Sequence, residues 1–109
     1  MKIDVVKEFM ALASLNSPSR KEAVVAEYLI EKLKRMGLDV QVDDSAPRSG
    51  SDTGNLIVRL PGTAPGPTIL LCAHMDTVGP TNGMKPVLRD GVITSNGETV
   101  LGADDKAGI

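Results

Sequence analysis

The sequence predicts a layered α/β domain in which helices come first and strands follow. Apolar residues recur at helical spacing in two segments before residue 37, and three apolar segments with strand character come after it. The last of these, TILLCA at residues 68–73, lacks the alternation of a half-buried strand, which favours burial on both faces. Helices followed by strands, with one strand doubly buried, are typical of α/β layering.

The first helix is expected within residues 3–15, and the second is expected to end at Gly37, which suits a left-handed C-cap. Two signals compete for the start of the second helix. Ser17, followed by a proline, suits an N-cap with proline at the first helical position. Ser19 and Glu22 also form a capping box. The sequence leaves the choice between these two starts open.

Strands are expected at residues 38–43, where apolar and polar side chains alternate, and at residues 55–60. The polar segment 44–54 between them is predicted to be a loop. Later in the chain, two dipeptides favour tight hairpin turns and predict a small β excursion at the surface. They are Asp90-Gly91 and Asn96-Gly97.

Composition limits the classes of function. The 109 residues suffice for one small domain, and their net charge of −2, with Lys and Arg scattered among acidic residues, favours neither nucleic acid nor an anionic membrane surface as a partner. Phe9 and Tyr28 are the two aromatic residues, too few to favour base stacking. The sequence lacks a membrane-length or signal-peptide-length apolar segment. The lone Cys72 fits a reducing cytoplasm.

The third strand ends in two ionisable residues, His74 and Asp76. Because side chains alternate along a strand, both point to the same side, at the carboxyl end where ligand sites of α/β sheets collect. A neutral imidazole binds zinc well, and a nearby carboxylate can accept the other ring N–H and fix the tautomer. Zinc takes about four donors, so further ligands must come from elsewhere.

Asp104 is the candidate for a further ligand. It follows two small residues in the segment GADDK and stands near the start of an expected helix, where a carboxylate is electrostatically favoured. A carboxylate can bridge two cations through its two oxygens, which makes Asp104 and Asp105 a candidate metal bridge.

Each of these features also has a structural alternative. His74 and Asp76 would suit a hydrogen-bonded pair at the surface, and ADDK would suit an acidic N-capping turn. Cys72 is expected to be a small buried hydrophobe. A further alternative makes the Cys72 thiol a nucleophile beside His74, although residues two apart on a strand lie about 7 Å apart along its axis.

Two segments together, LLCAHMDTV and SNGETVLGADDKAGI, resemble the first two metal motifs of the M20 metallopeptidases. HMDTVGP, KPVLRDGVITSNG and especially LGADDKAGI are similar to the peptidase T-like branch, and SPSRKEAVVAEYL is similar to the family's opening helix. The resemblance covers essentially the whole chain. It implies a layered α/β/α zinc-exopeptidase-like fold with a mixed sheet, of which residues 1–109 are the N-terminal part of the catalytic domain.

The resemblance also implies roles for individual residues. His74 would be a terminal ligand of one zinc ion, and Asp76 would be the carboxylate that orients its ring. Asp104 would bridge two zinc ions, the bond between Asp104 and Asp105 would be a cis peptide, and Asp105 would not be a ligand. The paired ions would activate a water that attacks the peptide bond. Cobalt and manganese suit the same donors, so the sequence does not fix the metal.

The remaining parts of such an enzyme are expected beyond residue 109. These parts are the glutamate general base, the other ligands and a lid domain that commonly mediates homodimerisation. We therefore expect this chain, as a fragment, to bind zinc weakly, to be inactive alone and to expose apolar surface. In the complete protein the implied activity is release of N-terminal residues from short peptides.

Two alternatives to this activity remain open. One is a metal-dependent deacylase of N-acyl amino acids within the same family. The other is a structural or interaction module without catalysis. A reading frame that continues past Ile109 into a Glu-Glu motif would support the enzyme, and a native stop codon there would support the module.

Overall fold

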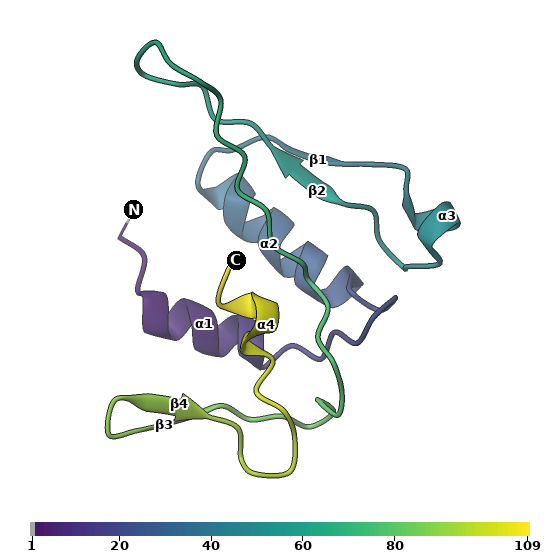
Figure 1. Ribbon diagram of the computed structural model, residues 1–109, viewed down its shortest axis with the longest axis vertical. Coiled ribbons are helices and arrows are strands. Elements are labelled where there is room, and N and C mark those ends of the chain that lie inside the picture. The colour runs from purple at the N-terminus through teal and green to yellow at the C-terminus, as the bar shows by residue number, and fades with distance from the viewer. Residues whose placement is uncertain (1) are drawn as a thin grey trace.

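The computed structural model describes residues 2–109, in which two helices precede a series of short strands (Figure 1). The helices are α1 (Val5–Ala13), α2 (Ala23–Arg35), α3 (Ala46–Ser49) and α4 (Ala103–Lys106). The strands are β1 (Val40–Val42), β2 (Leu56–Val58), β3 (Val87–Arg89) and β4 (Val92–Thr94). They form two separate antiparallel pairs, β1 with β2 and β3 with β4. The α/β class is confirmed, whereas the strands within residues 2–109 form no mixed sheet.

Helix α1 begins next to Asp4, whose side chain caps it. Asp4 Oδ1 accepts hydrogen bonds from the backbone N–H groups of Val6 and Lys7 at 3.1 and 3.2 Å. At the other end of the helix Leu12 and Ala13 are buried. The predicted first helix is confirmed.

Helix α2 begins at Ala23, later than either capping signal predicted. Its N-cap residue, Glu22, makes no side-chain capping bond, and Asp52 Oδ1 instead accepts a hydrogen bond from the N–H of Ala23 at 2.9 Å. Ser17 and Ser19 do not act as caps because their hydroxyls donate to the segment that carries the candidate metal ligands. Both predicted starts are therefore wrong, and the reason is a long-range contact.

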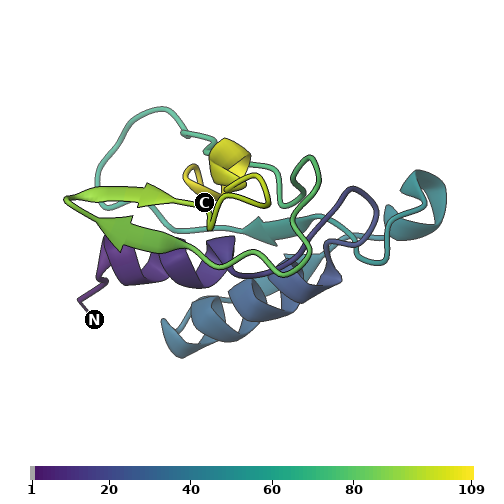
Figure 2. The ribbon, with the colours of Figure 1, turned by 90° about the horizontal axis from the view of Figure 1, so that it is seen from below.

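Helices α1 and α2 lie next to each other on one side of the molecule (Figure 2). Glu8 joins them, since its carboxylate accepts a hydrogen bond from the Tyr28 hydroxyl at 2.7 Å and forms an ion pair with Lys32. Burial raises the pKa of Glu8, but the hydrogen bonds from Lys32 and Tyr28 and the charge of Lys32 outweigh burial and leave the pKa below its usual value. The Glu8 carboxylate that joins the two helices is therefore ionised at neutral pH.

Gly37 ends α2 in the left-handed conformation, with φ 80°, as predicted, and leads into β1. The carboxylate of Asp43 joins the end of β1 to the start of β2. It accepts hydrogen bonds from the N–H and hydroxyl of Ser45 and from the backbone and side-chain N–H groups of Asn55. These bonds hold the pKa of Asp43 well below its usual range. The segment between the strands, predicted as loop, contains the single turn α3.

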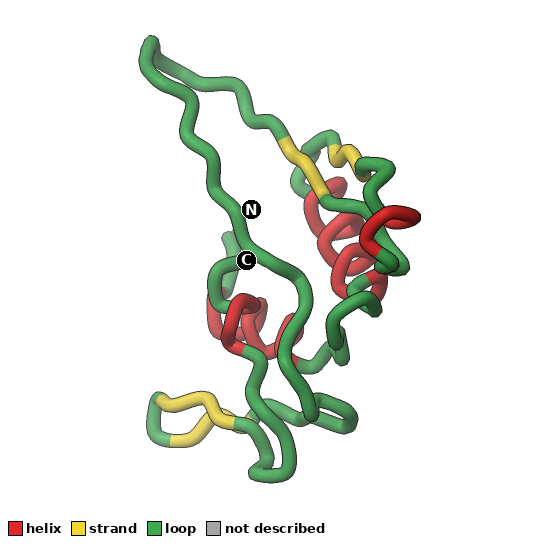
Figure 3. Tube along the Cα trace, turned by 45° about the vertical axis from the view of Figure 1, so that its right-hand side comes forward, coloured by secondary structure: helices red, strands yellow, loops and turns green. Residues whose placement is uncertain are grey.

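Residues 68–73 run as an extended segment without a hydrogen-bonded neighbour, drawn as loop in Figure 3. Ile69, Leu70 and Leu71 are 80%, 86% and 89% exposed. The prediction of a doubly buried strand is wrong for this chain, because such a strand needs a partner on each edge and none of the described residues pairs with it. Cys72, predicted to be buried, is exposed for the same reason.

Asp90 and Gly91 form the tight turn between β3 and β4, with φ values of 51° and 74° that match the left-handed requirement of such a turn. This predicted hairpin is confirmed. At the second dipeptide, the chain turns through Gly97 with φ 96°, but no strands pair across it. Within residues 2–109, none of the helices has both the length and the apolar character needed to span a membrane.

Candidate metal centre

The segment around His74 is held in place by the loop between α1 and α2. The Ser17 hydroxyl donates to the carbonyl of Met75 at 2.9 Å, and the N–H of Thr77 donates to the carbonyl of Ser17 at 2.9 Å. Pro18 and Thr77 form an isolated parallel bridge at the same place. Ser17 is fully buried and Thr77 nearly so, so this junction fixes the backbone from which His74 and Asp76 project.

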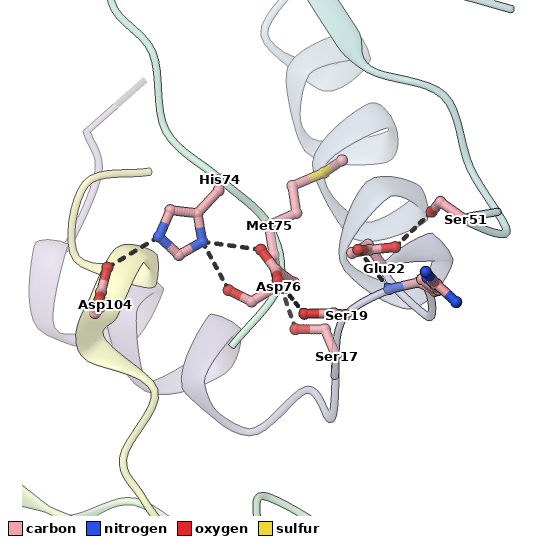
Figure 4. Close-up of polar contacts among 9 residues, drawn as sticks. Ser17, Ser19, Glu22, Ser51, His74, Met75, Asp76 and Asp104 are labelled. Atoms are coloured by element: carbon pink, nitrogen blue, oxygen red, sulfur yellow. Dashed lines mark hydrogen bonds and ion pairs between the residues drawn. The ribbon is translucent and has the colours of Figure 1, made fainter. Parts of the chain in front are cut away.

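His74 and Asp76 meet as the sequence predicted, on one side of the extended chain (Figure 4). His74 Nδ1 lies 3.0 Å from Asp76 Oδ1 and 2.9 Å from the carbonyl oxygen of Asp76. Both partners are acceptors, so Nδ1 carries the proton and donates it. In a neutral imidazole this leaves the lone pair on Nε2, the nitrogen that faces away from Asp76.

Asp104 lies on the other side of the ring. Its Oδ1 is 2.9 Å from His74 Nε2. A carboxylate oxygen and an imidazole lone pair are both acceptors, so they converge stably only around a cation, which is either the second ring proton or a metal ion. Imidazole nitrogen and carboxylate oxygen are common zinc ligands, so this pair fits the group that the sequence implies. The structure thus brings His74, Asp76 and Asp104 together.

The charges of the site shift two pKa values. The hydrogen bond with Asp104 raises the pKa of His74. Burial opposes this effect, and the carbonyl and carboxylate of Asp76 raise the pKa further. The hydrogen bond from Ser19 lowers the pKa of Asp76, with a further lowering by His74 against the effect of burial. Asp76 is therefore ionised at neutral pH and available as an acceptor for the imidazole.

Helix α4 presents Asp104 through an irregular backbone. Gly102 stands at its N-cap in the left-handed conformation, and the backbone angles of Asp104 and Asp105 are not helical. The peptide bond between Asp104 and Asp105 is cis, as the family resemblance implied. Helix α4 has no side-chain cap, so the alternative that ADDK is an acidic N-capping turn is wrong. The side chain of Asp104 is 95% exposed and accessible to a ligand.

Lys106 is a residue that the sequence reasoning missed. It is 2% exposed, and its ammonium group donates to the carbonyl of Leu15 in the loop after α1. Burial lowers its pKa. This contact fastens α4 beside α1 and so places Asp104 opposite His74. Nothing in the local pattern separates Lys106 from a solvated lysine, because its partner is far away in the sequence.

The described residues supply part of a metal site. No group of three or more His, Cys, Asp or Glu side chains that could hold a metal ion is found within residues 2–109. His74 and Asp104 are thus two candidate ligands of a site that needs about four donors per zinc ion. The alternative that uses Cys72 as a nucleophile gains no support, since both ring nitrogens of His74 already face Asp76 and Asp104.

Comparisons with known proteins show which proteins this chain is similar to. No family model matches the chain. It is similar to two crystal structures: the aminopeptidase PepT of Bacillus cereus, with 42% identity and a TM-score of 0.83, and a tripeptidase of Staphylococcus aureus, with 38% identity and a TM-score of 0.89. The similarity covers 94% and 95% of this chain and 28% of each of the other two chains.

Curated relatives include the protein YqjE of Bacillus subtilis, which is 43% identical over 96% of this chain and 28% of its own length. A putative [LysW]-lysine/[LysW]-ornithine hydrolase of Pyrobaculum aerophilum is 39% identical over 82% of this chain and 22% of its own length. The chain therefore spans less than a third of the length of these relatives.

In its fold and its paired motifs, the chain is similar to a segment of M20-type peptidases. Within that family, the chain is similar to the peptidase T-like branch, as its motifs predicted.

Proposed function

We propose that this chain is the N-terminal part of the catalytic domain of a dizinc exopeptidase that releases N-terminal residues from short peptides. The observation that carries the proposal is the convergence of His74 Nε2 and Asp104 Oδ1, with Asp76 behind the ring. The similarity to an aminopeptidase and a tripeptidase supports the choice of peptide substrates. The remaining ligands, the general base and the lid domain come from the rest of a longer, homodimeric cytoplasmic protein.

The described residues have distinct tasks in this proposal. His74 offers Nε2 to one ion, while Asp76 keeps the Nδ1 proton and so holds the ring in the ligating tautomer. Asp104, whose side chain is 95% exposed, would hold both ions. When bound, the ions supply an acidified water and polarise the scissile carbonyl. Ser17 fixes the backbone segment that carries His74, and Lys106 fixes the segment that carries Asp104. These two contacts keep the imidazole and the carboxylate within hydrogen-bonding distance of each other.

A deacylase is the second candidate function. The relatives named as putative [LysW]-lysine/[LysW]-ornithine hydrolases favour keeping it, because they indicate that similar chains occur in hydrolases with other substrates. The same metal centre would serve both reactions, since each hydrolyses an amide. The two candidates differ in whether the substrate presents a free amino group or an acyl group.

An assay of the complete enzyme separates the candidates and tests the need for metal. We expect hydrolysis of a tripeptide such as trialanine, its loss on treatment with a chelator and its return on addition of zinc, with an N-acetyl amino acid left intact. The measurement is amino acid release, followed by chromatography. Cleavage of the acyl substrate alone would replace the peptidase by the deacylase. Tripeptide hydrolysis that survives complete chelation would contradict the metal mechanism.

A further inference from the structure

Ser19 lies in the loop between α1 and α2 and reaches the candidate metal centre. Its hydroxyl donates to Asp76 Oδ2 at 2.5 Å, while Asp76 Oδ1 accepts from His74 Nδ1 at 3.0 Å (Figure 4). The two oxygens of one carboxylate are therefore occupied by two different donors. The chain Ser19–Asp76–His74 ends at Nε2, the nitrogen that faces Asp104.

The second hydrogen bond matters because a carboxylate held through one oxygen can still rotate about its last side-chain bond. With Ser19 on Oδ2, the plane of the Asp76 carboxylate is fixed from both sides, and the direction of the His74 ring is fixed with it. The side chain of Asp76 is 32% exposed, so water would compete for Oδ2 if the hydroxyl were absent. Ligand orientation by such supporting bonds is a general determinant of metal affinity.

Ser19 has no other task that the structure reveals. Helix α2 begins at Ala23, and its N-cap residue Glu22 takes no bond from Ser19. The residue is exposed, so its side chain contributes little to the packing of the core. Loss of the hydroxyl would therefore act on Asp76 rather than on the stability of the fold.

We propose that Ser19 is a positioning residue of the metal centre, acting through Asp76 on His74 to set the affinity for the metal ion and the rate of hydrolysis. The inference rests on the proposed function, because it concerns the same site. Ser19 touches neither metal nor substrate in this account. Ser19 orients the Asp76 carboxylate, which in turn orients the His74 imidazole. The loop between α1 and α2 therefore becomes part of the active site.

Ser19→Ala in the complete enzyme tests the proposal, and Ser51→Ala is the matched control. The Ser51 hydroxyl also donates to a carboxylate oxygen at 2.5 Å, that of Glu22, which does not contact His74 (Figure 4). The readouts are the zinc dissociation constant, measured by competition with a chromophoric chelator, and separate kcat and KM values for a tripeptide.

We expect Ser19→Ala to weaken zinc binding by about 10- to 100-fold and to lower kcat with KM little changed. Ser19→Thr, which keeps the hydroxyl, should restore most of the affinity, and Ser51→Ala should bind zinc like the wild type. Wild-type zinc affinity in Ser19→Ala, or an equal loss of zinc affinity in Ser51→Ala, would overturn the role of Ser19 but not the proposed function. A wild-type enzyme that binds no zinc would instead overturn the proposed function.

Discussion

Replacement of Asp104 by asparagine in the complete enzyme is expected to lower tripeptide hydrolysis by about a thousandfold or more. The substitution keeps the shape of the side chain but removes the charge and one of the two metal-binding oxygens. A bridging carboxylate would hold both ions, which stabilise the charge of the transition state by several kcal/mol. Each tenfold change in rate corresponds to about 1.4 kcal/mol, so loss of this stabilisation accounts for the expected fall in rate.

The measurements are kcat/KM for the tripeptide and the zinc content of the purified protein. Asp44→Asn is the control, because this carboxylate is 96% exposed and pairs with Arg48 away from the site. Surface ion pairs of this kind contribute little, so the control should retain full activity and zinc. Near-normal activity of Asp104→Asn would contradict the assignment of Asp104 as the bridging ligand.

The second large effect is expected at Gly54, where alanine should destabilise the junction of β1 and β2. A Cβ atom at this position would lie 2.1 Å from the carbonyl oxygen of Asp43 and 2.8 Å from its Oδ1. The backbone of Asp43 cannot move away without loss of the hydrogen bonds to Asn55 and Ser45. Overpacking together with these lost bonds should lower the free energy of unfolding by about 3 kcal/mol.

Thermal unfolding of the complete enzyme measures this effect. Gly62→Ala is the control, because a Cβ atom there would meet only the carbonyl oxygen of Ala64 at 3.6 Å, an ordinary contact. The control should change the free energy of unfolding by less than about 0.5 kcal/mol. If Gly54→Ala melted at the same temperature as Gly62→Ala, the close approach of Gly54 to Asp43 would not exist in solution.

Features of the fold that depend on neighbours in the sequence were predictable. The apolar spacing of residues 3–15, the glycine after α2 and the Asp90-Gly91 turn each act through contacts within a few residues, and each prediction is confirmed. The burial of residues 68–73 was not predictable in this way. Burial of a strand depends on the elements that pair with it and cover it, and within residues 2–109 nothing pairs with this segment.

The same distinction applies to the candidate site. His74 and Asp76 share one side of an extended chain because they are two residues apart, and the structure bears this out. Their meeting with Asp104 followed only from the resemblance of two motifs. Ser19 and Lys106 were missed, because their partners lie 57 and 91 residues away and neither residue has a distinctive local pattern. The capping signals of Ser17 and Ser19 predicted helix caps, whereas their hydroxyls donate to Met75 and Asp76.

The central claim is that His74 and Asp104 bind the same metal ion. Anomalous diffraction at the zinc absorption edge, from crystals of the complete enzyme, tests it most directly. We predict a zinc peak about 2.0–2.2 Å from both His74 Nε2 and an oxygen of Asp104, with a second peak on the other side of the Asp104 carboxylate. Zinc bound elsewhere in an active enzyme, with His74 and Asp104 still in direct contact and no peak between them, would contradict the account.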